Sequence, residues 1–423
     1  MSDADRLSTE SYKGVRDFYP EDWARLEAIF AIERGVLARA GYEEYQASPL
    51  ERAELYEAKT SEEIVNEQTY TFMDRGDRRV TLRPEMTPTL ARMVAAKRRE
   101  LAFPLRWFSI GNRFRYERPQ KGRLREFYQS DVDLVGAPEG EADIEVLMVA
   151  ADILTAFGAK PSDFIIRMNS RPLLNAACLA AGLKGEAVKR YLHLLDRKAK
   201  MEGGTFNATL HALTDLDPLT IIEEASAPPV AHEKAKVLER IEILAKRGVT
   251  NAVFDATLTR GFDYYTGMVF EIFDTSIENP RALFGGGRYD GLVALFGGEP
   301  IPAVGFAIGD VTLADFITTH KLVLDSATHQ PQVYIGTPSP SDIPAAQAFA
   351  RTLQAQECRI FVNLSEKSLG DQVKDADRRH IPLFIAYGRD EIASGTVRMK
   401  QLASGIESAF PASDLPLHLA SGS

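Results

Sequence analysis

Six basic residues crowd into one short stretch of a chain that is acidic overall. From residue 113 to residue 129 the sequence reads RFRYERPQKGRLREFYQ, and its basic residues are Arg113, Arg115, Arg118, Lys121, Arg123 and Arg125. Arginine guanidinium groups bind phosphate oxygens in pairs, so a loop of this kind suits an anion with several phosphates. The alternative is a charged loop that contacts only water. We interpret the stretch as a phosphate-binding loop.

The segments on either side of this loop have the pattern of strands. Residues 105–110 lead into it, and residues 127–134 lead out with partial alternation of apolar and polar side chains. The sequence therefore predicts a basic loop at the tip of a β-hairpin.

Composition limits the class of protein. The chain has 423 residues, enough for two or three domains, and a net charge of −10. That charge argues against a general nucleic-acid coat but leaves room for a local basic site. With two cysteines far apart, we expect neither a disulfide framework nor a structural zinc site. There is no apolar run of membrane-spanning length and no secretory signal pattern at residues 1–6, so we expect a cytoplasmic protein without a membrane span.

The first 320 residues mix strand and helix patterns. A helix is expected from a cap at Asp22 to about Ala40, a strand over 42–49, a hairpin of 69–74 with 79–83, and a helix from Thr87 to about Arg98. Residues 172–248 are rich in Leu, Ala, Lys and Glu, which predicts an inserted helical module.

The last part of the chain has a different pattern. After a linker over 321–331, strand and single-helix patterns alternate through residues 332–423, which indicates a small α/β domain. The chain as a whole is thus expected to be an α+β protein with this domain at its C-terminal end.

Four separate blocks carry a family resemblance. They are Leu82-Arg-Pro-Glu-Met-Thr87, the basic loop, Arg260-Gly-Phe-Asp-Tyr-Tyr265 and Gly285-Gly-Gly-Arg-Tyr-Asp-Gly291. In this order and spacing the chain resembles histidyl-tRNA synthetases, which belong to the class II aminoacyl-tRNA synthetases. Residues 14–18 look like the family's N-terminal signature, and residues 395–402 like part of its anticodon-binding domain.

The resemblance implies both a fold and an activity. Residues 1–320 would form a class II catalytic domain, an antiparallel β-sheet with a helical insertion, and residues 332–423 an anticodon-binding α/β domain. Residues 42–49 look like motif 1, whose proline sits at the interface of a homodimer. The expected enzyme is a histidine–tRNA ligase. It would use ATP with Mg²⁺ to convert L-histidine to histidyl-adenylate and would then transfer histidine to the 3′ end of tRNA(His).

The same resemblance assigns roles on the ATP side. Arg115 matches the arginine that clamps the α-phosphate and the substrate carboxylate, and Glu117 and Arg123 match residues that place ATP. Arg260 matches an arginine that acts on an α-phosphate oxygen, where a fixed positive charge would stabilise charge growing on phosphorus. The basic loop over 118–125 would also meet the acceptor end of tRNA.

On the amino-acid side, the resemblance points to six residues. Contacts to the α-amino and carboxylate groups are implied for Glu85, Thr87 and Gln129, and contacts to the imidazole ring for Asp133 and Tyr265, with Tyr264 beside them. Bacterial members usually have Glu where this chain has Asp133, and the alternative for Asp133 is a residue that faces outward from a strand. For the two tyrosines the alternative is ordinary core packing.

One motif departs from the family pattern. Motif 3 normally ends in Gly-x-Glu-Arg-Leu, and its arginine contacts ATP, but here Gly309-Asp-Val-Thr-Leu313 places Thr312 at the arginine position. We consider Arg288 as a replacement for ATP binding and Asp310 as a possible magnesium ligand. The departure also raises two alternative functions, a non-catalytic regulatory subunit of ATP phosphoribosyltransferase and a stand-alone tRNA-binding module.

Overall fold

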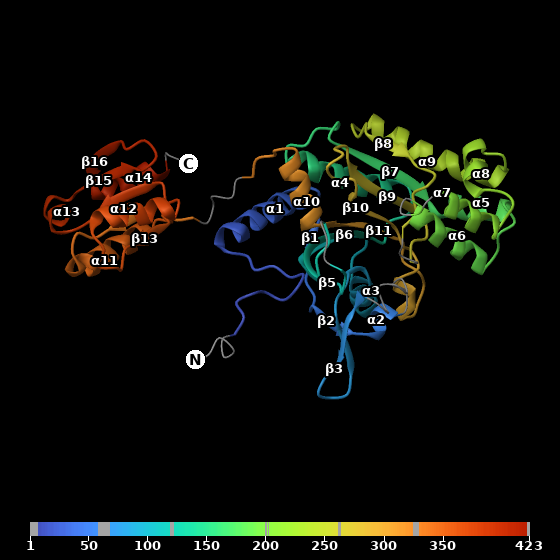
Figure 1. The fold of residues 1–423 in the computed structure, drawn as a ribbon, viewed down its shortest axis with the longest axis horizontal. Helices are drawn as coiled ribbons and strands as arrows, with labels where there is room; N and C mark the ends of the chain where they lie inside the picture. The colour runs from blue at the N-terminus through green and yellow to red at the C-terminus, as the bar shows by residue number, and fades with distance from the viewer. Residues whose placement is uncertain are drawn as a thin grey trace. The chain divides into compact units, whose positions relative to one another are not determined.

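The computed structural model describes residues 7–57, 68–118, 122–198, 201, 203–260, 264–324 and 330–420. Lys121 of the basic loop and residues 261–263 lie outside the described residues. The chain divides into two compact units, Met1–Leu324 and Asp325–Ser423 (Figure 1).

A mixed sheet forms the body of the first unit. Its strands are β1 (Glu43–Glu44), β5 (Leu105–Phe114), β6 (Glu126–Val135), β7 (Phe164–Ser170), β8 (Ala252–Phe254), β9 (Met268–Asp274), β10 (Ala282–Arg288) and β11 (Ala303–Gly309). Their order across the sheet is β1-β5-β6-β11-β10-β9-β7-β8. The pairs from β5 to β7 are antiparallel, as predicted, and the edge strands β1 and β8 pair in parallel.

The predicted hairpin around the basic loop is confirmed, since β5 and β6 pair antiparallel from Leu105 opposite Val135 to Phe114 opposite Glu126. Strand alternation sends successive side chains of β6 to opposite faces of the sheet. Val132 and Leu134 are buried in the main core on one face. Gln129 and Asp133 therefore share the other face, where both side chains line a pocket.

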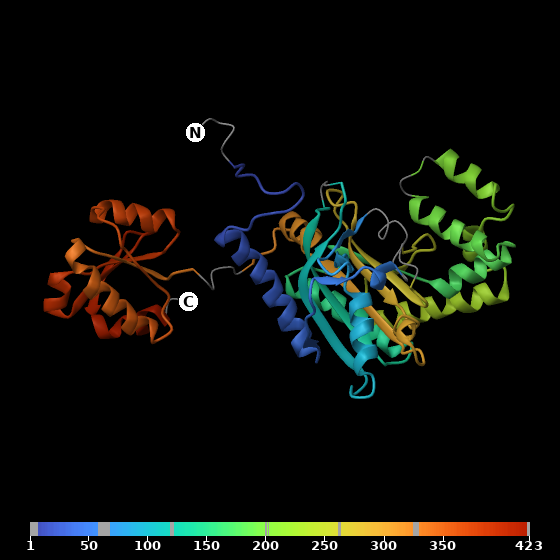
Figure 2. The same ribbon diagram turned by 90° about the horizontal axis from the view of Figure 1, so that it is seen from below.

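The core face of the sheet is covered by α1 (Pro20–Arg39), α4 (Glu141–Ala156) and α10 (Asp310–Thr319), together with α9 (Pro228–Lys246) (Figure 2). The predicted cap at Asp22 is wrong, because α1 begins at Pro20 after Tyr19, which makes no side-chain cap hydrogen bond. Proline suits the first helical position, where its missing N–H has no partner in any case. Asp22 therefore lies in the first turn.

A small sheet lies beside the main one, with the order β2-β4-β3. Its elements and neighbouring helices are β2 (Leu50–Arg52), α2 (Glu54–Glu57), β3 (Tyr70–Met73), β4 (Arg79–Leu82) and α3 (Thr87–Lys97). The hairpin of β3 with β4 is confirmed. The prediction of a continuous strand over 42–49 is wrong, because only Glu43 and Glu44 form a strand there. Pro49 at the end of this segment has no N–H to donate to a neighbouring strand.

Five helices lie between β7 and β8 among the described residues, in agreement with the helical pattern of this region. They are α5 (Arg171–Ala180), α6 (Glu186–Arg197), α7 (Gly203–His211), α8 (Pro218–Glu224) and α9 (Pro228–Lys246). Leu173, Tyr191, Phe206 and Ile222 belong to an apolar cluster of their own.

The second unit has the alternating order that its sequence predicts. Its elements are β12 (Val333–Gly336), α11 (Ile343–Gln354), β13 (Ile360–Val362), α12 (Leu369–Arg378), β14 (Leu383–Ala386), α13 (Arg389–Ser394), β15 (Thr396–Gln401), β16 (Glu407–Pro411) and α14 (Leu415–Ala420). The sheet order is β13-β12-β14-β15-β16, with a parallel first half and an antiparallel second half. Across the described parts of both units, no helix has the length and apolarity to cross a membrane.

Candidate active site

A pocket of about 340 Å³ opens on the face of the main sheet opposite α1 and α4. Side chains from β6, β9, β10, β11, α3 and the segment after Arg260 converge on it. We call it the main pocket, and its wall includes Glu85, Thr87, Arg115, Arg123, Gln129, Asp131, Asp133, Arg260, Tyr264, Tyr265, Glu271, Gly285, Tyr289 and Gly305. The structure thus brings together every residue that the sequence assigned to the amino acid, and both predicted catalytic arginines.

Asp133 is a buried carboxyl group in the wall of this pocket. Its Oδ1 accepts a hydrogen bond from the hydroxyl of Tyr289, while Oδ2 has no hydrogen-bond partner among the described residues. Burial raises the pKa of Asp133 to about 8, against the opposing effect of the Tyr289 hydrogen bond. A buried oxygen without a partner is costly, so this atom is prepared for a donor that arrives with a ligand.

Glycine makes room for Asp133 on the neighbouring strand. Gly305 of β11 pairs with Asp133 of β6. A methyl group on Gly305 would overlap Oδ1 of Asp133 and would lie 2.5 Å from the carbonyl oxygen of Val132. The absence of a side chain at Gly305 therefore leaves room for the carboxyl group of Asp133 beside it.

A second carboxylate, Glu85, lies in the segment between β4 and α3. Glu85 is 3% exposed, and its Oε2 accepts a hydrogen bond of 2.9 Å from the hydroxyl of Tyr264. The rings of Tyr264 and Tyr265 lie 4.9 Å apart, and both line the pocket. This part of the main pocket thus combines two carboxyl groups with two aromatic rings.

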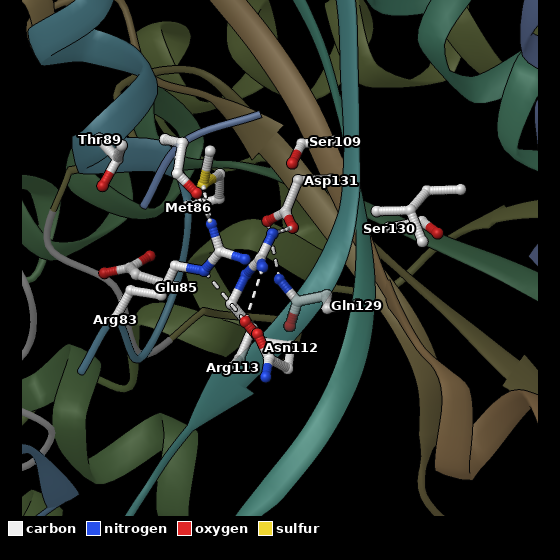
Figure 3. Close-up of polar contacts among 12 residues, drawn as sticks. Arg83, Glu85, Met86, Thr89, Ser109, Asn112, Arg113, Gln129, Ser130 and Asp131 are labelled. Carbon is white, nitrogen blue, oxygen red and sulfur yellow. Dashed lines mark hydrogen bonds and ion pairs between the residues drawn. The ribbon is translucent and has the colours of Figure 1, made fainter. Parts of the chain in front are cut away.

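Gln129 is held by a buried ion pair beneath the pocket. Figure 3 shows Arg113 reaching both the carbonyl oxygen of Asn112 and the carboxylate of Asp131. Nε2 of Gln129 donates to the same carboxylate at 2.7 Å. Arg113 has no exposed surface, so its predicted place in a phosphate-binding cluster is wrong: its charge is used inside the protein.

Two arginines bring positive charge to the same pocket. Arg260 pairs with Glu271 of β9 through an Nη1–Oε1 distance of 2.7 Å. Nη1 of Arg260 also lies above Gly285, where it would be 2.6 Å from an added methyl group. Arg115 donates from Nε to the carbonyl oxygen of Pro84 at 3.0 Å, and its guanidinium lies 5.3 Å from the ring centre of Phe127. Each of these side chains is oriented by fixed partners.

A smaller space of about 180 Å³, the side cavity, adjoins the main pocket. The two share Arg115 and Arg123, and the side cavity is further lined by Glu117, Gly122, Leu124, Phe127, Leu283, Gly309, Val311 and Thr312. Arg123 pairs with Glu117 at 3.1 Å. The residues predicted to place ATP therefore lie around this second space, together with Thr312.

Two predicted site residues do not line either space, and both predictions need correction. Arg288 is 1% exposed, and its guanidinium pairs with Asp143 at 2.7 Å and with Asp290 at 2.9 Å, so it is a structural ion pair and not a contact for ATP. Asp310 accepts from Nη2 of Arg16 at 2.6 Å and from the backbone N–H of Tyr128 at 2.9 Å. Both of its oxygens are engaged inside the protein and the residue is 4% exposed, so Asp310 does not face the spaces in which a nucleotide-bound metal ion was predicted.

Three polar side chains of the main pocket escaped the sequence prediction. Asp131 shares a face with Gln129 and Asp133 by strand alternation, which is a signal in the sequence. Tyr289 stands in the predicted glycine-rich block directly after Arg288. Glu271 gives no local signal, because its partner Arg260 comes from a different segment.

Known proteins resemble this chain over nearly its whole length. A family model described as histidyl-tRNA synthetase matches residues 14–312, and one described as an anticodon binding domain matches residues 332–419. A histidine–tRNA ligase of Leptospira biflexa is 40% identical over 424 residues, which cover 97% of each chain. One of Halobacterium salinarum is 38% identical and covers 96% of each. The crystal structure of histidyl-tRNA synthetase from Nostoc sp. PCC 7120 has a TM-score of 0.77 at 22% identity and covers 98% of this chain and 99% of that one.

Proposed function

This chain belongs to the histidyl-tRNA synthetase family and is a histidine–tRNA ligase, and from that premise we propose which of its side chains bind histidine and which act on ATP. The histidine–tRNA ligases that match this chain do so over nearly its full length, which favours this activity over the regulatory-subunit alternative. Support for the assignment of roles comes from one observation: carboxyl groups suited to histidine and arginines suited to phosphate line the same pocket.

The imidazole ring binds at Asp133. One ring N–H donates to Oδ2, the carboxyl oxygen that has no partner among the described residues. Tyr289 holds Oδ1 and so fixes the direction of Oδ2. A site built to pair with a ring N–H rejects amino acids that lack one, because the buried carboxyl group would then stay unpaired.

The backbone groups of histidine bind between α3 and β6. The carboxylate of Glu85 attracts the α-ammonium group, with Thr87 and Gln129 as hydrogen-bonding neighbours on the same wall. The α-carboxylate then points toward Arg115 and Arg260, the two positive charges of the main pocket. The amino acid is thereby held at both ends, which orients its carboxylate for reaction.

The activation step joins this carboxylate to ATP. A carboxylate oxygen attacks the α-phosphorus, the bond from that phosphorus to the oxygen bridging the β-phosphate breaks, and pyrophosphate leaves. Negative charge grows on the α-phosphate oxygens, where Arg260 and Arg115 stabilise it. Because Glu271 and Pro84 hold these side chains in place, little reorganisation is needed during the step.

Magnesium is expected as the counterion of the ATP phosphates, as is general among aminoacyl-tRNA synthetases. Among the described residues there is no cluster of three or more His, Cys, Asp or Glu side chains that would hold a metal ion. We therefore propose that magnesium arrives bound to the nucleotide, and we assign it no step of its own.

A homodimer is also part of the proposal. Large apolar side chains are exposed on the small sheet, namely Leu50 at 44%, Phe72 at 49% and Met73 at 55%. Leu50 of β2 directly follows Pro49 of motif 1, and Phe72 and Met73 lie on β3 of the same sheet. A partner subunit on this sheet would remove them from water. The anticodon-binding domain at residues 332–419 supports tRNA as the second substrate.

Histidine-dependent exchange of pyrophosphate into ATP tests the assigned roles without tRNA. Arg260→Ala is expected to lower kcat roughly a hundred- to a thousand-fold with little change in the KM for histidine. Asp133→Ala is expected to raise the KM for histidine and to leave the KM for ATP near the wild-type value. Arg167→Ala is the control, because this arginine lies on β7 and is 42% exposed. A folded Arg260→Ala enzyme with wild-type kcat would overturn the catalytic assignment.

A further inference from the structure

A third cavity adjoins the side cavity, and its wall contains Arg281, a residue outside the motifs of the sequence. This outer cavity has a volume of about 360 Å³ and is lined by Gly122, Ile277, Glu278, Asn279, Pro280, Arg281, Leu283, Thr312 and Asp315. It shares Gly122, Leu283 and Thr312 with the side cavity, which in turn shares Arg115 and Arg123 with the main pocket. The three spaces adjoin one another, and Arg281 stands at the far end.

Arg281 and Thr312 both approach Gly122. A methyl group placed on Gly122 would lie 3.8 Å from Nη1 of Arg281 and 3.8 Å from Cγ2 of Thr312. The hydroxyl of Thr312 donates to the carbonyl oxygen of Leu283 at 2.6 Å. The first turn of α10 is thus tied to β10 two residues beyond Arg281.

A second anchor fixes the loop that carries Arg281. Asn279 is 8% exposed, and its Nδ2 donates to Oδ2 of Asp274 at 2.7 Å and to the hydroxyl of Thr319 at 3.0 Å. Asp274 is the last residue of β9, and Thr319 is the last residue of α10. The loop between β9 and β10 is therefore pinned to the same helix that presents Thr312, which gives the base of Arg281 a defined position.

We propose that Arg281 binds the phosphate tail of ATP at the boundary between the outer and the side cavity, and so supplies beside Thr312 the positive charge that position 312 lacks. The inference rests on the proposed function. A guanidinium group binds phosphate oxygens in pairs, and Thr312 offers only a hydroxyl whose hydrogen is already donated to Leu283. Glu278 and Asp315 also line the outer cavity, so the phosphate is bound on the Gly122 side of Arg281 and not among these carboxylates.

The test uses the full-length enzyme in histidine-dependent ATP–pyrophosphate exchange. Arg281→Ala is expected to raise the KM for ATP roughly ten- to a hundred-fold and to leave the KM for histidine within about twofold. Arg281→Lys keeps the charge but loses the paired donors, so it is expected to fall between Arg281→Ala and the wild type. Arg167→Ala is again the matched control, and thermal unfolding confirms that each variant is folded.

A rescue variant separates a missing charge from a disturbed loop. The double substitution Arg281→Ala with Thr312→Arg returns a guanidinium to the same boundary, and it is expected to recover most of the affinity for ATP. The inference is overturned if Arg281→Ala leaves the KM for ATP at the wild-type value. It is also overturned if the substitution changes only the KM for tRNA in the aminoacylation reaction. If the wild-type enzyme gives no exchange, the proposed function fails and not the role of Arg281.

Discussion

Tyr289 donates its hydroxyl hydrogen to Oδ1 of Asp133, and this hydrogen bond opposes the effect of burial on the carboxyl group. Burial alone favours the neutral acid, while the phenol stabilises the carboxylate. The balance leaves the pKa of Asp133 at about 8. With the imidazole ring bound at Asp133 as proposed, histidine recognition should therefore depend on pH in a way that the tyrosine controls.

The first prediction concerns Tyr289→Phe. In the wild type the carboxylate form of Asp133 appears only as the pH rises through about 8, so kcat/KM for histidine should rise over that range. The substitution removes a hydrogen bond that lowers this pKa, so the rise should move to higher pH. The measurement is the pH profile of kcat/KM in pyrophosphate exchange. Tyr334→Phe in the second unit is the control, and an unchanged profile in Tyr289→Phe would contradict the role of the phenol.

The second prediction concerns Gly305→Ala. The added methyl group would overlap Oδ1 of Asp133, and it would lie 2.5 Å from the carbonyl oxygen of Val132, which cannot retreat without breaking the pairing of β6 with β11. We expect the KM for histidine to rise more than about tenfold and the melting temperature to fall. Gly291→Ala is the matched control, because a methyl group there meets nothing within 4 Å. Equal behaviour of the two variants would refute the steric argument.

The family resemblance, carried by the motif blocks, predicts most residues of this pocket, and local rules account for part of their arrangement. Alternation along β6 puts Gln129 and Asp133 on one face, and the β5–β6 hairpin follows from two strand patterns around a loop. The order of the motif blocks then indicates which segments contribute side chains to the same pocket.

Long-range ion pairs are what the sequence does not reveal. Arg288 binds Asp143, which is 145 positions away, and Asp310 binds Arg16, which is 294 positions away. A charged side chain shows its type in the sequence but not its partner, so both residues looked available to ATP or magnesium. Arg113 was misread for the same reason, because Asp131 on the neighbouring strand neutralises it inside the fold.

The third prediction follows from the pairing of Arg288 with Asp143. Removing one partner of a buried pair leaves the other charge without compensation, and Arg288→Ala should destabilise the fold by about 3–5 kcal/mol. Thermal or denaturant unfolding measures this, and the KM for ATP should stay near the wild-type value at temperatures where the variant is folded. In a double-mutant cycle, Asp143→Asn should lower the free energy of unfolding of the Arg288→Ala variant less than it lowers that of the wild type. A large rise in the KM for ATP without loss of stability would restore the nucleotide role for Arg288.

The last prediction concerns Glu33, a carboxyl group of α1 that is 1% exposed and is hydrogen-bonded by the hydroxyl of Ser130 on the core face of β6. Burial raises its pKa to about 7. An unfolded glutamate ionises near pH 4.3, so between about pH 4.3 and 7 the unfolded chain loses this proton while the folded protein keeps it.

Over that range the folded state binds more protons than the unfolded state, so stability falls as the pH rises, by up to about 1.4 kcal/mol per pH unit for this one group. Glu33→Gln removes the titration. The melting temperature of the variant minus that of the wild type should therefore increase from about pH 5 to pH 7 and then level off. Glu239→Gln on the exposed face of α9 is the control for the substitution of a glutamate by glutamine in itself. A difference for Glu33→Gln that is flat from pH 5 to 7 would show that the buried carboxyl group is already ionised in the folded protein.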